Sequence, residues 1–408
     1  MIDYPLVEVI EGKTIILVPD VEAFRKSPSS FPPSDAPVFY NKRMEINRDF
    51  ALALLRVYLK KEHKGDEFLY CEPMAGSGIR SVRVAKEIDN INVIINDRNP
   101  LAVELIRENI SQLNLSEKTQ VYEEDANELM LRFSAAGKKF DIIDIDPFGT
   151  PAPFLDAAAQ AINKNGLLAI TSTDMATKCG VYPKACLRKY ASQPIHTWIG
   201  HEMAVRILLG FTAITLARHG RSMNPIFVQS TDHFIRCYVI AEKNITKAKN
   251  IMNEMGYAAH CTNCYSIEYA KGIINHLSVD CPKCENKRLI GGPIWLGKMY
   301  NMDFVIELQE QLQEDKANYG TKKKMQKMLE LIMDEVKAEN SNHDIAFYYD
   351  IHQITDKFNL ISPKSSTVIK ELQKGNFIAT RTHFKHTAIK TNAPIEKIIS
   401  AIKKAINT

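Results

Sequence analysis

Between residues 68 and 171 the chain alternates short apolar runs with segments whose apolar residues recur at helical spacing. Such alternation predicts parallel strands joined by helices, that is, an α/β domain with a doubly wound sheet. The expected strands are Phe68–Cys71, Ile91–Asn96, Gln120–Tyr122, Phe140–Ile145 and Leu167–Ile170. The expected helices include Ile79–Ile88 and Pro100–Leu113. Because ligands of open α/β sheets bind beyond the carboxyl ends of the strands, the residues directly after these runs are the first candidates for a site.

The segments outside this sheet predict an N-terminal arm and a second, smaller domain. Ser27–Pro37 is rich in Pro and Ser and is expected to form an ordered loop or arm, not a helix. Pro194–His219 and Phe304–Glu339 have helical composition. Two helices, extended strands and a last helix are then expected over Asp344–Phe358, Ser365–Gln373, Phe377–Ile389 and Pro394–Ile406. We therefore expect a first domain at residues 1–240 and an α+β domain at 241–408, with a possible winged-helix module at about 340–408.

The composition argues against an exported or membrane protein. The most apolar segment, Val205–Ala217, is interrupted by Arg206 and Gly210, and the first residues lack a basic region followed by an apolar stretch. Eight cysteines in 408 residues are too few for a disulfide scaffold. These features predict a cytoplasmic protein without a membrane segment, and no feature indicates an obligate protein partner.

Four of the cysteines form two Cys-x-x-Cys pairs with the spacing of a zinc ribbon. The pairs Cys261/Cys264 and Cys281/Cys284 are separated by 16 residues, within the range typical of tetrahedral zinc sites. Four thiolate ligands would leave no open position for water, so the expected Zn²⁺ is structural and the ribbon should span about residues 258–290. Chance pairing of buried cysteines is the alternative.

A glycine-containing loop follows the first expected strand. Gly76 and Gly78 lie between this strand and the next helix, where glycine lets the backbone approach a ligand closely. Asp97 ends the next strand, where an acid can accept hydrogen bonds from both ribose hydroxyls of a nucleoside cofactor, and Asp125 follows the third strand. The loop lacks the full Gly-x-Gly-x-x-Gly pattern, because Arg80 and Ser81 follow Gly78, and this disfavours a nicotinamide cofactor.

The strand at residues 140–145 runs into Asp146-Pro147-Phe148-Gly149. We consider whether this motif could serve to methylate the amino group of a nucleic-acid base. Such an amino group is a poor nucleophile because its lone pair is delocalised into the ring, so the site must hold it in position. Asp146 could accept one N–H and take up a proton, the Pro147 carbonyl could accept the other N–H, and Phe148 could stack on the base. A tight turn after a strand is the structural alternative for these four residues.

Many stretches of the chain, these residues included, closely resemble the tRNA (guanine-N2)-dimethyltransferase family. The matching stretches are Ser34–Asn41, Asn47–Asp49, Ser77–Arg80, Asn96–Asp97, Asp125–Asn127, Asp144–Pro151, Ala185–Tyr190, His201–Glu202, Gly292–Gly297 and Arg381–Phe384. They are distributed over nearly the whole chain, so the resemblance is not limited to one domain. The resemblance implies a Rossmann-like class I methyltransferase domain that uses S-adenosyl-L-methionine to methylate the exocyclic amino group of guanine at position 26 of tRNA.

The resemblance also implies roles for individual residues. The methyl donor would contact Arg48, Arg80, Asp97, Asp125 and Ala126, with Gly76 and Gly78 in its loop. Asp146 would be the catalytic carboxylate, with Pro147 beside it, and Phe39 and Phe148 would sandwich the guanine. The residues alone do not assign a role to Arg48. Read on their own, Arg48 and Arg80 are basic residues beside helix starts. Each of the two either meets the methionine carboxylate or forms an ordinary surface pair.

The C-terminal part is the expected tRNA-binding region. Net charge is +4, and residues 241–408 carry 24 Lys and Arg against 19 Asp and Glu, so the positive excess is C-terminal. Lys357–Lys390 interleaves seven cationic side chains with Phe358, Phe377 and Phe384. Two alternatives stay open. One is an amino-directed methyltransferase acting on DNA or ribosomal RNA, and the other is a non-catalytic zinc-ribbon RNA-binding protein.

Overall fold

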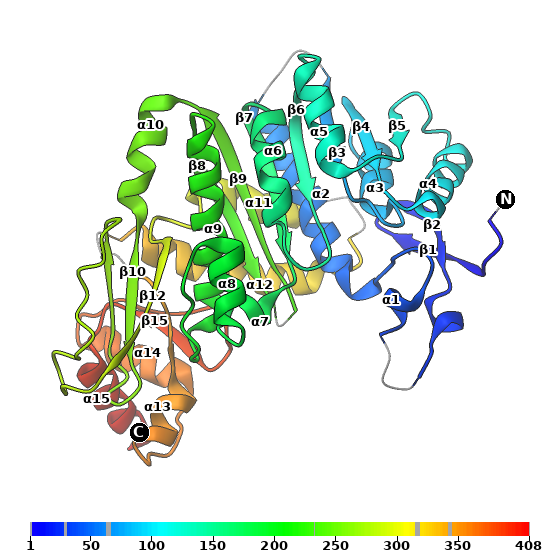
Figure 1. Cartoon of the computed structure of the whole chain (residues 1–408). Coiled ribbons are helices and arrows are strands. Elements are labelled where there is room, and N and C mark those ends of the chain that lie inside the picture. The colour runs from blue at the N-terminus through cyan, green and yellow to red at the C-terminus, as the bar shows by residue number, and fades with distance from the viewer. Residues whose placement is uncertain are drawn as a thin grey trace.

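A computed structural model of the chain describes residues 2–27, 31–62, 67–231, 233–314, 319–341 and 345–407 (Figure 1). Its centre is a seven-stranded sheet of order β5-β4-β3-β6-β7-β9-β8. The strands are β3 (Phe68–Glu72), β4 (Ile91–Asn96), β5 (Thr119–Tyr122), β6 (Phe140–Ile145), β7 (Ile162–Ser172), β8 (Arg221–Ser230) and β9 (Ile235–Lys243). All five expected strands are confirmed. The predicted Rossmann-like class of the first domain is thus present.

The direction of the strands decides where a site can form. β3 to β7 are parallel, and β9 runs antiparallel to both β7 and β8. β8 therefore points the same way as the parallel strands, and its end lies on their carboxyl edge. The hairpin of β8 and β9 was not among the expected elements, although it adds two strands to this edge of the sheet.

Helices cover the sheet and connect its strands. They are α2 (Glu45–Glu62), α3 (Ile79–Glu87), α4 (Pro100–Gln112), α5 (Ala126–Ala135), α6 (Leu155–Ala161) and α9 (Gly200–Arg218). Local signals fix their starts: Asn99 caps α4, with Pro100 at its first position, and the Asp125 side chain accepts hydrogen bonds from the backbone of Asn127 and Glu128 at the start of α5. Shorter elements are η2 (Lys42–Met44), η3 (Ala152–Phe154), α7 (Met175–Lys178), α8 (Pro183–Tyr190) and α10 (Ile245–Asn250).

Two expectations about helices are corrected. The helical region expected from Pro194 begins only at Gly200, because Gln193 exchanges two backbone hydrogen bonds of 2.9 Å with Gly292 and because proline disfavours a helical residue before it. The arm expected to be free of helix contains one helical turn, α1 (Pro32–Asp35), since proline is tolerated at a helix start. Residues 28–30 of that arm lie outside the described part of the chain.

The N-terminal segment forms a hairpin that packs beside the sheet. β1 (Leu6–Glu11) and β2 (Thr14–Pro19) are antiparallel, and η1 (Val21–Phe24) follows. The backbone of Leu17 exchanges hydrogen bonds of 2.8 and 2.9 Å with the side chain of Asn109 on α4. The hairpin also brings Glu11, at the end of β1, to Arg48 on α2.

The chain beyond residue 243 forms a ribbon, two long helices and a small module. η4 (Ile251–Glu254) leads into the ribbon of β10 (Met255–Cys261), β11 (Ile267–Lys271) and β12 (Arg288–Trp295), with order β11-β10-β12. α11 (Met302–Glu314) packs on α2 and β8, and α12 (Lys322–Glu339) also packs on α2. The long helical region expected there is thus two helices, and residues 315–318 between them are outside the described ranges.

The last part of the chain is a small α+β module. It consists of β13 (Tyr349–Asp350), α13 (Ile351–Lys357), α14 (Ser365–Lys374), β14 (Ala379–Arg381), β15 (Ala388–Thr391) and α15 (Ile395–Ile406), with sheet order β13-β15-β14. The helix expected from Asp344 is shorter than predicted, because Tyr349 and Asp350 pair with β15 and the Asp350 side chain caps α13. Asp344 itself is outside the described residues.

Two large hydrophobic cores and a small third cluster of Val38, Ala102 and Leu105 hold the described part of the molecule together. The main core runs from Ile16 in the hairpin to Ala388 in β15, and so contains residues on both sides of position 240. The second core lies within residues 349–405. In the described part of the chain, no helix is both long and apolar enough to cross a membrane.

Candidate active site

A cavity of about 830 Å³ opens at the carboxyl edge of the central sheet. Its size is that of a small-molecule site. The candidate residues that follow successive strands line it together: Gly76, Arg80, Asp97, Asp125, Ala126, Asp146, Pro147 and Phe148. Arg48 of α2 and Phe39 of the arm join them. Gly78, beside this wall, is needed for packing, since a Cβ there would lie 2.6 Å from Ile106 Cγ1.

The loop after β3 is held in a fixed shape against β4. Gly76 and Gly78 have positive φ angles of 54° and 73°, which favour glycine. The N–H of Gly76 donates to Asp97 Oδ2 at 2.7 Å, and the N–H of Ser77 donates to the Phe39 carbonyl at 3.2 Å. The glycine loop, the acid after β4 and the N-terminal arm are therefore built as one unit.

Asp97 has both oxygens in hydrogen bonds with backbone N–H groups. Besides Gly76, the N–H of Asn99 donates to its Oδ1 at 2.9 Å. Burial raises the pKa of Asp97, and these backbone donors oppose the rise. A carboxylate oxygen has two lone pairs, so Asp97 keeps capacity to accept from hydroxyl groups of a ligand.

Arg48 is buried under the arm. Its Nε donates to Glu11 Oε2 at 2.7 Å, and its Nη2 donates to the Asn41 carbonyl at 3.2 Å. The guanidinium also lies 5.5 Å from the centre of the Tyr40 ring. Arg48 is thus not a solvated surface residue, since it joins the hairpin to the cavity wall.

Arg80 is the centre of a second buried network. Its Nε donates to Glu72 at 3.0 Å, its Nη1 donates to Asn47 at 2.7 Å, and its Nη2 pairs with Asp146. Burial opposes the charge, but Asp144 and Asp146 outweigh it and raise the pKa of Arg80 well above its ordinary value. The ion pair fixes the side chain of the candidate catalytic acid at the mouth of the cavity.

The two candidate stacking rings lie in contact with each other. Phe148 is 74% exposed, and its ring centre is 4.5 Å from that of Phe39, with an interplanar angle of 84°. This is an edge-to-face pair. A base can be sandwiched between these rings only if they separate.

The end of the candidate catalytic loop, Asp146–Gly149, is anchored by the segment after β7. The Gly149 N–H donates to Thr173 Oγ1 at 2.8 Å, and the Gly149 carbonyl accepts from the Thr173 N–H at 2.9 Å. Thr150 Oγ1 lies 2.6 Å from the hydroxyl of Tyr190, which also contacts both oxygens of Asp174 at 3.0 Å. The sequence did not single out these anchoring residues, because they lie 20 or more positions away from the loop they hold.

Other lining residues were also missed. The tip of the β8–β9 hairpin contributes Thr231, His233 and Phe234, and Phe31 comes from the arm. The signal that could have placed the hairpin tip is the apolar run of β8, whose end falls on the same edge as the ends of the parallel strands.

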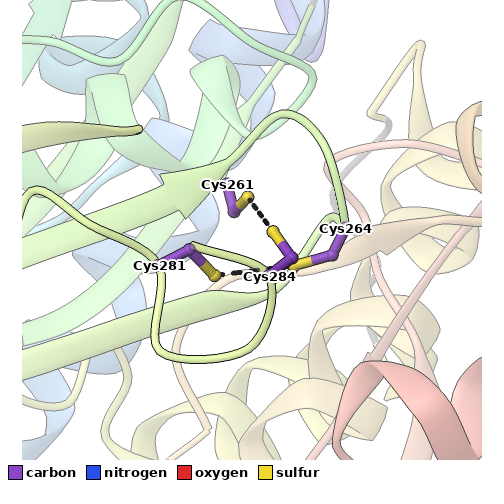
Figure 2. A group of neighbouring side chains, drawn as sticks. All are labelled: Cys261, Cys264, Cys281 and Cys284. Carbon is purple, nitrogen blue, oxygen red and sulfur yellow. Dashed lines mark hydrogen bonds between the residues drawn. The ribbon is translucent and has the colours of Figure 1, made fainter. Parts of the chain in front are cut away.

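The four cysteines expected to bind zinc lie together at one end of the ribbon (Figure 2). Their Sγ atoms are all within 4.8 Å of one another, with 3.5 Å from Cys261 to Cys284 and 3.7 Å from Cys264 to Cys281. A tetrahedral zinc ion with Zn–S bonds of about 2.3 Å would separate its sulfurs by about 3.8 Å. The cluster is therefore compatible with structural zinc. The other four cysteines are free thiols.

Comparison with known proteins gives one consistent result. A family model described as N2,N2-dimethylguanosine tRNA methyltransferase matches residues 12–403. Proteins of Methanobrevibacter smithii and Methanosarcina acetivorans, both named tRNA (guanine(26)-N(2))-dimethyltransferase, are 37% and 38% identical over 404 and 402 residues, which is 99% and 97% of this chain and 98% of each relative.

Among solved structures, the complex of Trm1 from Pyrococcus horikoshii with S-adenosyl-L-methionine is similar with a TM-score of 0.82 at 30% identity. The match covers 97% of this chain and all of that one. The similarity in sequence and in fold thus extends over both the sheet and the C-terminal part.

Proposed function

The chain belongs to the N2,N2-dimethylguanosine tRNA methyltransferase family, and we propose that it methylates the exocyclic amino group of guanine 26 in tRNA. Its methyl donor is S-adenosyl-L-methionine, as in this family. The observation that carries the proposal in the structure is the position of Asp146, which stands at the lip of a cavity whose other wall holds the glycine loop, Asp97 and Asp125.

We place the donor along the glycine loop. Asp97 accepts hydrogen bonds from the ribose hydroxyls, and the adenine lies beside Asp125 and Ala126. The methionine carboxylate meets Arg48 or Arg80. A guanidinium carries five N–H donors, and the three neighbours of Arg80 that accept from it use one each. The remaining donors of Arg80 can therefore bind a carboxylate without breaking its pair with Asp146.

We place the guanine between the donor and the catalytic loop. One oxygen of Asp146 is held by Arg80, which leaves the other to accept an N–H of the guanine amino group. As the nitrogen attacks the methyl carbon and the S–C bond breaks, the nitrogen becomes cationic and gives its proton to this carboxylate. The Pro147 carbonyl accepts the second N–H. Phe148 moves away from Phe39 to stack on the base, which contributes about 1–3 kcal/mol.

The C-terminal part, residues 241–408, is the proposed tRNA-binding region. Zinc in the cysteine cluster braces the ribbon, and the winged-helix module presents Lys364, Lys370 and Lys374 of its second helix region to solvent. Positive side chains on a helix suit the phosphates of a folded RNA. Because its substrate is tRNA and its cysteines are thiols, we propose that the protein works in the cytoplasm.

Substitution Asp146→Ala tests the assignment. We expect methyl transfer from labelled donor to unmodified tRNA to fall by about 10²- to 10⁴-fold, with donor binding retained. Asp156→Ala is the matched control, because Asp156 lies on α6 outside the cavity and is half exposed. Nucleoside analysis should give N2-methylated guanosine at position 26. Near-normal turnover by Asp146→Ala would reject the catalytic role, and donor binding without any transfer to tRNA would reject the substrate.

A further inference from the structure

The short helices α7 and α8 carry a surface that the reaction described above does not use. α8 buries Cys186 and Tyr190 against the body of the protein. Lys184, Leu187 and Arg188 are exposed, and their spacing of three and four residues places them on one face of the helix. The function of this face is not explained by the packing of α8.

Apolar side chains are exposed on the same segment. Val181, Tyr182 and Leu187 are 50%, 60% and 54% exposed, within a stretch of seven residues. Grouped apolar exposure of this kind marks surfaces that meet a partner. Lys184 and Arg188 form no ion pair with any described residue, whereas their neighbour Lys189 pairs with Asp174 at 3.5 Å. The surface thus combines an aromatic ring with two uncompensated positive charges.

The segment is attached directly to the catalytic loop. Tyr190, at the end of α8, hydrogen-bonds Thr150, which follows the catalytic loop Asp146–Gly149. At the other end, the N–H of Tyr182 donates to the Ala176 carbonyl at 3.4 Å, three residues after Thr173 in the cavity wall. In Figure 1, α7 and α8 lie on the same lower side of the molecule as α13 and α14. The segment is thus tied at both ends to chain that borders the cavity.

We propose that this surface, the α8 shoulder (Val181, Tyr182, Lys184, Leu187 and Arg188), binds the RNA backbone next to the target guanine. The inference rests on the proposed function. An extruded base leaves its neighbours partly unstacked, and Tyr182 supplies a ring on which a neighbouring base stacks. Lys184 and Arg188, about one helical turn apart, contact successive phosphates. Val181 and Leu187 cover the apolar faces of the sugar and base.

Charge reversal of the two cations tests the proposal. The double variant Lys184→Glu, Arg188→Glu should raise KM for tRNA about tenfold or more, with donor affinity unchanged and kcat at saturating tRNA within about twofold. The association constant for tRNA, K, falls as salt concentration rises. Loss of two phosphate contacts should make the decrease of log K with log salt concentration less steep by about 1.5–2. The control is Lys118→Glu, Lys138→Glu, which makes the same charge change at exposed sites before β5 and β6, on the opposite edge of the sheet.

A second variant tests the stacking. Tyr182→Ala should raise KM for tRNA by about tenfold, and Tyr182→Phe should restore it, since the ring and not the hydroxyl makes the contact. If the charge-reversed protein misfolds and loses donor binding, the double variant Lys184→Gln, Arg188→Gln is used in its place. Its KM for tRNA should likewise rise. Unchanged KM and salt slope in folded variants, while the unaltered enzyme methylates tRNA, would overturn the α8 shoulder but leave the proposed function standing. Absence of transfer by the unaltered enzyme would overturn the proposed function itself.

Discussion

The ammonium group of Lys178 is fully buried and lies among polar groups that support the catalytic loop. It pairs with Asp174, lies 2.6 Å from Ser172 Oγ and 3.4 Å from the hydroxyl of Tyr190. Burial lowers the pKa of Lys178, although Asp174 opposes this. Tyr190 then carries the network to Thr150 at 2.6 Å. The support of the loop at residues 146–149 therefore depends on side chains that do not line the cavity.

Tyr190→Phe should separate support of the loop from general stability. The ring keeps its packing on Phe211, and the loss of the hydroxyl's hydrogen bonds to Thr150 and the charged Asp174 should cost about 1.5–3 kcal/mol of stability. We expect kcat to fall about fivefold to twentyfold, because the catalytic loop loses one anchor, while KM for tRNA and donor affinity stay unchanged. Steady-state kinetics and donor titration measure these quantities.

Tyr58→Phe is the control for this effect. Tyr58 is equally buried and donates to the Asn165 carbonyl at 3.1 Å, away from the cavity. It should lose about 1 kcal/mol of stability without a change in kcat. An equal loss of kcat in both variants would show that Tyr190 acts only through the stability of the fold.

Single residues of the site were predictable when a strand placed them. Asp97, Asp125 and Asp146 follow apolar runs, so their meeting at one edge follows from the direction of the strands. The partner of Arg48 was not predictable, because Glu11 belongs to a hairpin whose docking depends on tertiary packing. The roles of Arg48 and Phe39 came only from the resemblance to a known family, and their contacts with donor and base stay predictions.

At the scale of elements, buried charges join α12 to the C-terminal module of residues 349–406. Glu335 accepts hydrogen bonds from the backbone and Nδ1 of His383 at 2.7 Å, from Thr382 Oγ1 at 2.9 Å, and pairs with Lys390 at 3.0 Å. Burial would raise the pKa of Glu335, but Lys390 and His383 outweigh it and lower the pKa to about 2. Glu339, one turn later, has its pKa raised to about 7 by burial.

Glu335→Gln should therefore change how stability depends on pH. The pKa of Glu335 is about 2 in the folded chain and near 4.5 when unfolded, so its ionisation stabilises the fold above pH 4.5 and this contribution is lost as pH falls toward 2. The shift corresponds to about 3 kcal/mol. Urea denaturation should show the largest deficit of the variant near neutral pH and a shrinking deficit as pH falls below 4.5. Glu330→Gln, at an exposed position of the same helix, is the control. A deficit that does not depend on pH would contradict the ionised state of Glu335.

Elements with a strong internal pattern were predicted best. The parallel strands are continuous apolar runs and α4 has a cap and a proline at its start, so their bounds agree within a few residues. Short strands such as Tyr349–Asp350 carry too few residues for a pattern, and only their pairing with β15 defines them. The start of α9 depends on the contact of Gln193 with Gly292, which is 99 positions away, and no local pattern reports it.

At the scale of the whole molecule, the functional division at residue 240 does not coincide with a division of the core. The main core includes Phe304, Val305, Leu308 and Leu312 of α11, all at most 3% exposed. α11 packs on α2 and on β8 of the catalytic sheet. The sequence suggested two domains because the chemistry and the cysteines fall in different halves, but it could not show that two C-terminal helices complete the core of the first half.

A fragment of residues 1–240 should for this reason fail to fold stably. Burial of the four apolar side chains of α11 alone contributes about 6–12 kcal/mol at 1.5–3 kcal/mol each, which is comparable to the 5–15 kcal/mol of net stability of a typical protein. The cut also ends the chain inside β9, whose last residues pair with the start of β8. Compared with the full chain, the fragment should lack a cooperative thermal transition and should bind S-adenosyl-L-methionine at least tenfold more weakly in calorimetric titration, although it contains every residue assigned to the donor. A fragment that melts cooperatively and binds the donor as the full chain does would show that residues 241–341 are an accessory to the catalytic domain and not part of its core.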